Sequence, residues 1–217
     1  MRSTEEAMTF TIWGRASSTN VQKVTWALTE LDLPYERIDC AGPYGKTDTP
    51  EFFELNPNRR VPVLQEGDFT LWESHAILRF LARRTGRLMP EGEYARALAD
   101  QWLDFTATTF QPSSTGIFWQ IFRYPEEARD TGRLKELRGA LAGAFAVMET
   151  RLGSHDWLTG DDFGMADIAA GTLMYRLGDM GYLGDIPDGV ARWHARLADR
   201  PAYRAIVEYP YDELLAY

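Results

Sequence analysis

Cysteine and histidine are scarce in this chain. Its 217 residues include one cysteine, Cys40, and three histidines, His75, His155 and His194, which lie far apart in the sequence. A single cysteine excludes an internal disulfide framework and a thiolate-rich metal site, and the separations of the histidines do not match the spacing of zinc ligands. We therefore predict no bound metal and a protein of a reducing compartment, and we interpret the histidines as structural or surface residues.

The chain also lacks an excess of basic residues and any long apolar run. Its 23 lysines and arginines stand against 32 acidic residues, which gives a formal net charge of −9. Proteins that bind nucleic acids or anionic membranes over a broad surface use basic side chains to neutralise phosphates, so we predict no such partner. No run approaches the ~20 apolar residues of a membrane span. The N-terminal MRSTEEAM has no signal-peptide core, and we predict a cytoplasmic protein.

Apolar residues make up 45% of the chain, and their periodicity divides it into two parts. The first part, residues 1–86, predicts an α/β domain with the order β-α-β-α-β-β-α. The turn Glu66-Gly67-Asp68 makes its last two strands an antiparallel hairpin. The expected strands are residues 10–13, 35–38, 61–65 and 69–71, and the expected helices are residues 21–31, 50–55 and 73–84.

The second part, residues 92–217, predicts an all-helical domain. Four residues recur at helical spacing on one face of its first long helix: Leu98, Trp102, Phe105 and Thr109. Six others are expected on one face of a second long helix: Leu134, Leu137, Leu141, Phe145, Met148 and Leu152. The fold class that we predict is α/β plus all-α.

Two neighbouring segments carry the most specific motifs. Residues 56–64 read Asn-Pro-Asn-Arg-Arg-Val-Pro-Val-Leu, and residues 73–77 read Glu-Ser-His-Ala-Ile. Together they resemble the glutathione-binding signature of the glutathione transferase family, and the serine-containing loop before the first helix resembles that of theta-like and zeta-like bacterial members. The resemblance implies a thioredoxin-like N-terminal domain, an all-helical C-terminal domain, glutathione as co-substrate, a homodimer and a role in detoxification.

A third motif lies in the helical part. Residues 164–169, Gly-Met-Ala-Asp-Ile-Ala, resemble a capping motif of the family in which Ser or Thr usually stands where Gly164 is. Asp167 is expected to accept a hydrogen bond from the free backbone N–H of Gly164. We interpret this motif as a folding feature, so Asp167 is not a catalytic candidate.

The resemblance implies that the first two motifs bind glutathione. A cis peptide bond before Pro62 would leave the N–H and C=O of Val61 free to pair with the cysteinyl backbone of glutathione. Ser74, at the start of a helix, would bind the γ-glutamyl carboxylate, and Glu73 would bind the neighbouring ammonium group. Ordinary helix capping by Ser74 is the alternative, and the two uses can coexist.

Nearby cations would bind the glycine carboxylate of glutathione. Arg60 is the first candidate, because the resemblance places a basic residue at its position, and Lys46 is a secondary candidate. Solvated surface is the alternative for an exposed arginine in a loop. Cations here, in an otherwise acidic protein, favour a local anion site.

Transferase chemistry requires the thiolate of glutathione, because the thiolate is the nucleophile. A free thiol titrates near ~8.5, and lowering its pKa by about two units requires about 2.7 kcal/mol. A hydrogen bond to a charged acceptor contributes about 1.5–3 kcal/mol, and a helix N-terminus about 0.3–1 kcal/mol. The loop before the first helix offers both, and the resemblance places Ser18 at the catalytic serine. Ser17, Thr19 and Asn20 remain alternatives, and all four residues could simply cap the helix.

The acceptor pocket is expected between Ser18 and the first long helix of the second domain. Aromatic and hydroxyl residues concentrate on that helix, and the candidates are Phe105, Thr109, Phe110, Ser113, Phe118 and Trp119. Such a wall suits a small hydrophobic electrophile, although core packing is the alternative for each aromatic residue.

We therefore predict a glutathione S-transferase whose bound thiolate attacks a hydrophobic electrophile. A glutathione-dependent peroxidase, isomerase or dehalogenase would use the same thiolate. A non-catalytic binding module of the same fold is the alternative from another class. Cys40 lies outside the loop, so disulfide exchange lacks its usual attacking group there.

Overall fold

The computed structural model describes residues 9–183 and 185–215. Its sheet has four strands in the order β2-β1-β3-β4. β1 runs parallel to β2 and antiparallel to β3, and β4 forms a hairpin with β3. The strands are β1 (Phe10–Trp13), β2 (Tyr35–Ile38), β3 (Val63–Glu66) and β4 (Phe69–Trp72).

Side chains that alternate along the strands contribute to two separate cores. Ile12 and Leu64 point into the main core, which α1 and α3 cover. Trp13 and Val63 point to the opposite face, where Phe52 of α2 packs against them. The helices of this part are α1 (Thr19–Glu30), α2 (Pro50–Leu55) and α3 (Ser74–Thr85), so the predicted order β-α-β-α-β-β-α is confirmed.

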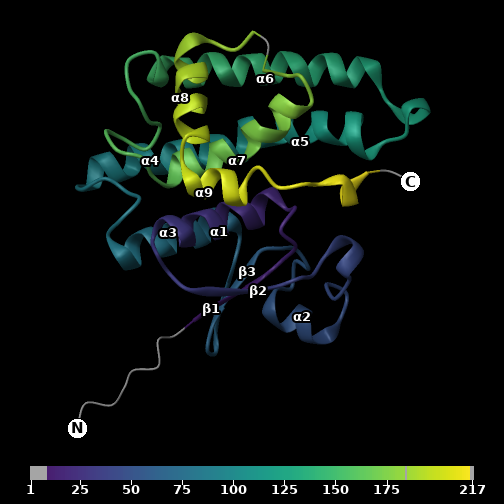
Figure 1. Ribbon diagram of the computed structural model, residues 1–217, viewed down its shortest axis with the longest axis vertical. Helices are drawn as coiled ribbons and strands as arrows, with labels where there is room; N and C mark the ends of the chain where they lie inside the picture. Colours follow the sequence, from purple (N-terminus) through teal and green to yellow (C-terminus); the bar gives the residue numbers. More distant parts are fainter. Residues whose placement is uncertain (1–8, 184, 216–217) are drawn as a thin grey trace.

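The rest of the described chain is helical, and it packs on the side of α1 that faces away from the sheet (Figure 1). One nearly continuous helix is made of α4 (Glu93–Phe105), the π-helical segment η2 (Thr106–Phe110), α5 (Gln111–Phe118) and the π-helical segment η3 (Trp119–Arg123). The other helices are α6 (Thr131–Leu152), α7 (Met165–Asp179), α8 (Asp188–Ala198) and α9 (Pro201–Ile206). Short 3₁₀ turns are η1 (Gly42–Tyr44), η4 (Glu126–Ala128) and η5 (Asp212–Leu214). None of the helices in the described ranges is long and apolar enough to span a bilayer.

The buried face of the first long helix differs from the predicted one. Trp102 is buried and Phe105 is half-buried, as predicted, but Leu98 is 58% exposed and Thr109 is also exposed, whereas Ala99 and Leu103 are buried in the main core. A π turn bonds each N–H to the carbonyl five residues earlier, so η2 changes the angular position of every residue after it. Pro112 gives a reason for this widening, because a proline ring clashes with the carbonyl four residues before it in a regular helix.

The prediction for the second long helix is confirmed. α6 buries Leu137, Leu141, Phe145, Met148 and Leu152, all at 5% exposure or less. Leu134, one turn earlier, packs at the edge of the same core. This helix contains no π segment, so its apolar period of three and four residues continues without a change of phase.

The predicted cap of α7 is confirmed. An oxygen of the Asp167 carboxylate accepts a hydrogen bond from the N–H of Gly164 at 3.1 Å. The buried carboxylate also accepts from the N–H of Leu158 at 2.7 Å and from Nε1 of Trp193 at 2.8 Å. Burial raises the pKa of Asp167, and these donors oppose that rise. Asp167 therefore joins the start of α7 to α8 and to the preceding loop.

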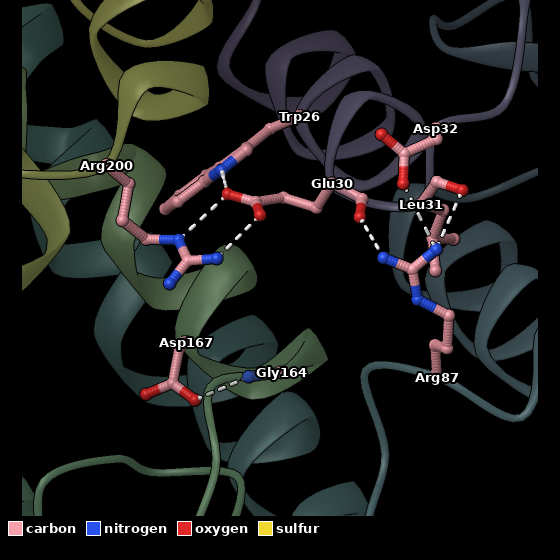
Figure 2. Close-up of polar contacts among 8 residues, drawn as sticks. All are labelled: Trp26, Glu30, Leu31, Asp32, Arg87, Gly164, Asp167 and Arg200. Atoms are coloured by element: carbon pink, nitrogen blue, oxygen red, sulfur yellow. Dashed lines mark hydrogen bonds and ion pairs between the residues drawn. The ribbon is translucent and has the colours of Figure 1, made fainter.

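A polar clamp joins the sheet-containing part to the helical part (Figure 2). Both carboxylate oxygens of Glu30, the last residue of α1, accept from the guanidinium of Arg200, at 2.8 and 2.6 Å. Nε1 of Trp26 donates to the same carboxylate at 2.9 Å. Arg87 donates to the backbone carbonyl of Glu30 at 2.7 Å, so the C-terminal end of α1 is held from two sides.

Candidate active site

The connection between α2 and β3 presents a free stretch of backbone. The Val61-Pro62 peptide bond is cis, as predicted. Within the described residues, neither the N–H nor the C=O of Val61 has a hydrogen-bond partner. Asn56, which is buried, holds this loop by donating to the carbonyl of Arg60 at 2.8 Å and accepting from the N–H of Asn58 at 2.9 Å. The backbone of Val61 is therefore available to a ligand.

The start of α3 lies beside this backbone. Ser74 is the first residue of α3 and is buried, and Glu73 before it has a φ of 71°, in the left-handed region. Such a conformation is uncommon for a residue with a side chain and often marks a functional site. A cavity of about 320 Å³, here named the Val61 cavity, is lined by Asn20, Asn56, Asn58, Arg60, Val61, Pro62, Glu73 and Ser74.

The loop before α1 presents its hydroxyl groups to a second cavity. Ser18 is the N-cap residue of α1, but its side chain makes no capping hydrogen bond. In the described part of the chain, the hydroxyls of Ser18 and Thr19 have no hydrogen-bond partner. Ser17 differs, because it is fully buried and its hydroxyl donates to Glu213. Simple capping therefore does not describe Ser18, whose hydroxyl remains free to donate.

This second cavity, here named the arginine cavity, measures about 290 Å³ and lies between the loop and the helical part. It shares Asn20 and Arg60 with the Val61 cavity, so the two meet at these residues. Its lining consists of Arg15, Ser17, Ser18, Thr19, Asn20, Arg60, Gln111, Ser114, Thr115, Phe118, Trp119, Arg123, Leu173, Arg176 and Leu214.

Asn20 lies at the junction and is held by a buried polar cluster that the sequence analysis missed. Its Oδ1 accepts from Nζ of Lys23 at 3.1 Å, from Nε2 of Gln111 at 3.2 Å and from the hydroxyl of Ser74 at 3.5 Å. Lys23 also donates to Oε1 of Gln111 at 2.6 Å and lies 3.0 Å from Nε2 of His75. With its oxygen saturated by donors, the amide of Asn20 keeps its NH₂ group for the cavities.

Burial sets the protonation of this cluster. The pKa of Lys23 is lowered to about 7 because the side chain is fully buried, and Glu73 opposes that shift. Burial also lowers the pKa of His75 to about 2, with Lys23 and Arg79 adding to the shift, so this imidazole is neutral at physiological pH. One feature of the sequence could have indicated this cluster: Lys23 is a charged residue between the apolar positions Val21 and Val24.

The structure brings only part of the predicted acceptor wall to the cavity. Phe118 and Trp119 line the arginine cavity, but Phe105, Thr109, Phe110 and Ser113 do not. Phe110 is fully buried and packs against Phe145 of α6, and the hydroxyl of Ser113 is bonded back to the carbonyl of Phe110 at 2.9 Å. Three further residues of this helix line the cavity, Gln111, Ser114 and Thr115, and all of them follow the π segment η2.

Cations in the lining also differ from the prediction. Arg60 lines both cavities, whereas Lys46 lines neither and donates to the carbonyl of Asp39 at 3.0 Å. Arg15, Arg123 and Arg176 join Arg60 in the arginine cavity, and the sequence analysis did not identify them. Their positions are contributed by three distant segments, so no local motif connects them.

The remaining reactive groups lie away from the two cavities. Cys40 is buried between β2 and η1, and burial raises the pKa of its thiol to about 11, so it is a neutral thiol at physiological pH. Across residues 9–183 and 185–215, no three His, Cys, Asp or Glu side chains are grouped to hold a metal ion.

Comparison with known families identifies this arrangement. The family model described as "Glutathione S-transferase, N-terminal domain" matches residues 8–83, and the one described as "Glutathione S-transferase, C-terminal domain" matches residues 126–196. The chain belongs to the glutathione S-transferase family. The predicted family, fold class and enzyme class are therefore confirmed.

Individual members of the family resemble this transferase along most of its length. The chain is 37% identical to glutathione S-transferase GstB of Escherichia coli K12 over 204 residues, which are 92% of this chain and 98% of the relative. A theta class glutathione S-transferase of Xanthomonas axonopodis pv. citri, solved with glutathione bound, superposes with a TM-score of 0.86 at 36% identity, covering 94% and 99% of the two chains. A glutathione transferase of Burkholderia graminis, solved with two glutathione molecules per subunit, gives a TM-score of 0.83 at 28% identity, covering 96% and 91%.

Proposed function

We propose that this transferase conjugates glutathione, its co-substrate, to electrophiles, with glutathione in the Val61 cavity and its sulfur at the junction with the arginine cavity. The observation that carries the proposal is the free backbone of Val61, beside the start of α3, in a cavity that joins the one lined by Ser18. The Val61 backbone pairs with the cysteinyl residue of glutathione. Ser74 and the free N–H groups of α3 bind the γ-glutamyl carboxylate, and Glu73 binds its ammonium group.

Arg60 is the proposed partner of the glycine carboxylate. It lines the Val61 cavity, and within the described residues its side chain has no ion pair and no hydrogen bond. Arg59 is not equivalent, because its guanidinium lies over the ring of Phe53 and pairs with Asp48 at 3.6 Å. Lys46 is a weaker candidate for binding the glycine carboxylate, because its ammonium group already donates to the carbonyl of Asp39.

Ser18 is the proposed thiol-activating residue. Its free hydroxyl and the unpaired N–H groups at the start of α1 together supply about the 2.7 kcal/mol that a shift of two pKa units requires. The hydroxyl donates to the sulfur and does not become a nucleophile. The sulfur then attacks the electrophilic carbon of the acceptor in the arginine cavity.

The test is Ser18→Ala, assayed for conjugation of 1-chloro-2,4-dinitrobenzene across pH. Loss of a hydrogen bond to a charged sulfur should lower kcat/KM about 10- to 100-fold at neutral pH and raise the apparent thiol pKa by about one to two units. Thr19→Val removes the neighbouring hydroxyl, and Ser154→Ala removes an exposed one elsewhere as a control. A normal pH profile in Ser18→Ala together with a shifted one in Thr19→Val would move the role to Thr19.

Other uses of the same thiolate remain consistent with this site. A peroxidase, isomerase or dehalogenase would need the same glutathione contacts and the same Ser18. A non-catalytic module is disfavoured because the free hydroxyl of Ser18 and the free backbone of Val61 both face cavities. The role that we propose is detoxification of electrophiles.

We also propose that the enzyme is a cytoplasmic homodimer. The single buried cysteine suits a reducing compartment. Support for the dimer comes from large apolar side chains that are exposed on the edge strand β4 and on α4: Phe69, Trp72, Tyr94 and Leu98. Tyr94 is 87% exposed, which favours a partner surface over this region.

A further inference from the structure

The arginine cavity carries far more positive charge than the rest of this acidic protein. Arg15, Arg60, Arg123 and Arg176 all line it, and among the described residues its lining includes no acidic side chain. All the ion pairs in the described ranges involve other arginines. Nε of Arg15 is buried and has no hydrogen-bond partner in the part of the chain that the structure describes. Four guanidinium groups without an ion pair in the described ranges, gathered around one small space, are a site for anions.

The contacts that hold the guanidinium groups in place do not neutralise their positive charge. Arg176 is only 8% exposed, stacks against the rings of Phe118 and Tyr211, and donates to the carbonyl of Ser17. Arg123 lies over the ring of Trp119, with 5.7 Å to the ring centroid. These partners are aromatic faces and a backbone carbonyl, so none of them brings a full negative charge.

Repulsion within the cluster is the electrostatic cost of this arrangement. Burial lowers the pKa of Arg15, and Arg123 lowers it further, while Glu213 opposes the shift. Burial lowers the pKa of Arg176 to about 10, and Arg15 adds to that shift, so the group stays charged at neutral pH. Glu213, whose charge acts on Arg15, already accepts from Ser17 and from the hydroxyl of Tyr44 at 3.1 Å.

Glutathione does not account for all of this charge. In the proposed function its glycine carboxylate pairs with Arg60, and its γ-glutamyl carboxylate lies at the start of α3. Glu213 and the thiolate offset two of the other three arginines, which leaves one positive charge without a counterion. The acceptor is what enters this space, and Phe118 and Trp119 supply apolar walls next to the arginines.

We propose that the preferred acceptors are aromatic electrophiles that carry a carboxylate, bound with the ring against Phe118 and Trp119 and the carboxylate on Arg123 and Arg15. This inference rests on the proposed function and replaces the neutral hydrophobic electrophile with an anionic one. For a benzylic bromide, the thiolate sulfur forms a bond to the benzylic carbon while the carbon–bromine bond breaks and bromide leaves with the electron pair. The carboxylate takes no part in the bond changes and serves only for binding.

The test compares 4-(bromomethyl)benzoate with 4-(bromomethyl)benzamide, which differ in charge and hardly in shape. The kcat/KM of each probe at saturating glutathione is divided by the rate constant of its uncatalysed reaction with glutathione. We expect the wild-type enzyme to favour the benzoate at least tenfold, and Arg123→Gln to lower that preference about tenfold or more. Arg192→Gln removes an exposed arginine of α8 outside the cavity and should keep the wild-type preference.

The results of this comparison distinguish a failure of the anion site from a failure of the proposed function. If the wild-type enzyme converts both probes equally well, or if Arg123→Gln keeps the preference for the benzoate, the anion site is wrong while the transferase activity stands. If neither probe is converted, the proposed conjugation fails. The anion site is then tested on its own by calorimetry with unreactive 4-methylbenzoate and 4-methylbenzamide, where equal affinity for the two compounds would overturn it.

Discussion

Lys23 is a charged side chain enclosed by the packing of α1, α3 and the helical part. Its ammonium group has three polar neighbours, the oxygens of Asn20 and Gln111 and a ring nitrogen of His75. The pKa lowered to about 7 by burial means that the folded protein holds this proton weakly. The unfolded chain holds it up to about pH 10.4. Stability must therefore depend on pH through this residue.

The sign of that dependence follows from the bound protons. Between about pH 7 and pH 10.4 the unfolded state binds a proton that the native state has lost, so the free energy of unfolding rises with pH. Comparing wild type with Lys23→Met isolates this contribution, because other groups titrate alike in both. From pH 7 to pH 9 we expect the wild type to gain about 2 kcal/mol relative to the variant in urea unfolding. Parallel pH profiles for the two proteins would contradict this.

Single residues also show which parts of the site the sequence could predict. The positions of Val61, Pro62 and Ser74 at the Val61 cavity were predictable, because each depends on its own backbone or on the start of its own helix. The position of Ser18 before α1 belongs to the same group. Arg176 and Lys23 were not predictable as site residues, because their roles depend on partners 159 and 88 positions away in the chain. Periodicity describes one element at a time and carries no information about such pairs.

At the scale of elements, the two long helices of the helical part show why one prediction held and the other did not. The apolar stripe of α6 continues over its whole length, so its buried face followed from the sequence. The helix from α4 to η3 contains two π segments, and each of them shifts the following residues around the helix axis. A regular helical repeat in the sequence does not predict that shift. Gln111, Ser114 and Phe118, which line the arginine cavity, all follow the first of these segments, η2.

The start of α7 depends on one buried carboxylate. Asp167 accepts from three backbone N–H groups and from Nε1 of Trp193, and removing it leaves all these donors unpaired inside the protein. We expect Asp167→Ala to lower the free energy of unfolding by about 3–5 kcal/mol, because unpaired buried polar groups cost about 1–3 kcal/mol each and relaxation recovers part of the loss. Urea unfolding followed by circular dichroism measures it.

A matched control for this element is Asp188→Ala. Asp188 is also in the first turn of a helix, α8, but it is exposed and its carboxylate has no hydrogen-bond partner in the described part of the chain. Its loss should cost less than about 1 kcal/mol, the ordinary value for an acidic residue at a helix N-terminus. A similar loss in both variants would show that the cap acts through charge alone and not through its buried hydrogen bonds.

For the whole molecule, α1 is the element that both parts share. Its start carries Ser18 and Asn20 at the cavities, and its end carries Glu30 in the clamp with Arg200 (Figure 2). The arginine cavity takes one wall from the loop before α1 and the other from α5 and α7. The position of one part relative to the other therefore sets the width of the arginine cavity.

The clamp predicts how that position is maintained. In Arg200→Met the half-buried carboxylate of Glu30 loses both guanidinium bonds and keeps Nε1 of Trp26. We expect a loss of about 1–3 kcal/mol in urea unfolding, because breaking a buried pair costs about 3–5 kcal/mol and this pair is partly exposed. Arg204→Met, which removes a fully surface pair with Asp199, should cost less than about 1 kcal/mol. Equal losses in the two variants would mean that the contact between Glu30 and Arg200 does not hold the two parts together, and hydrogen exchange at the end of α1 would then be unchanged in Arg200→Met.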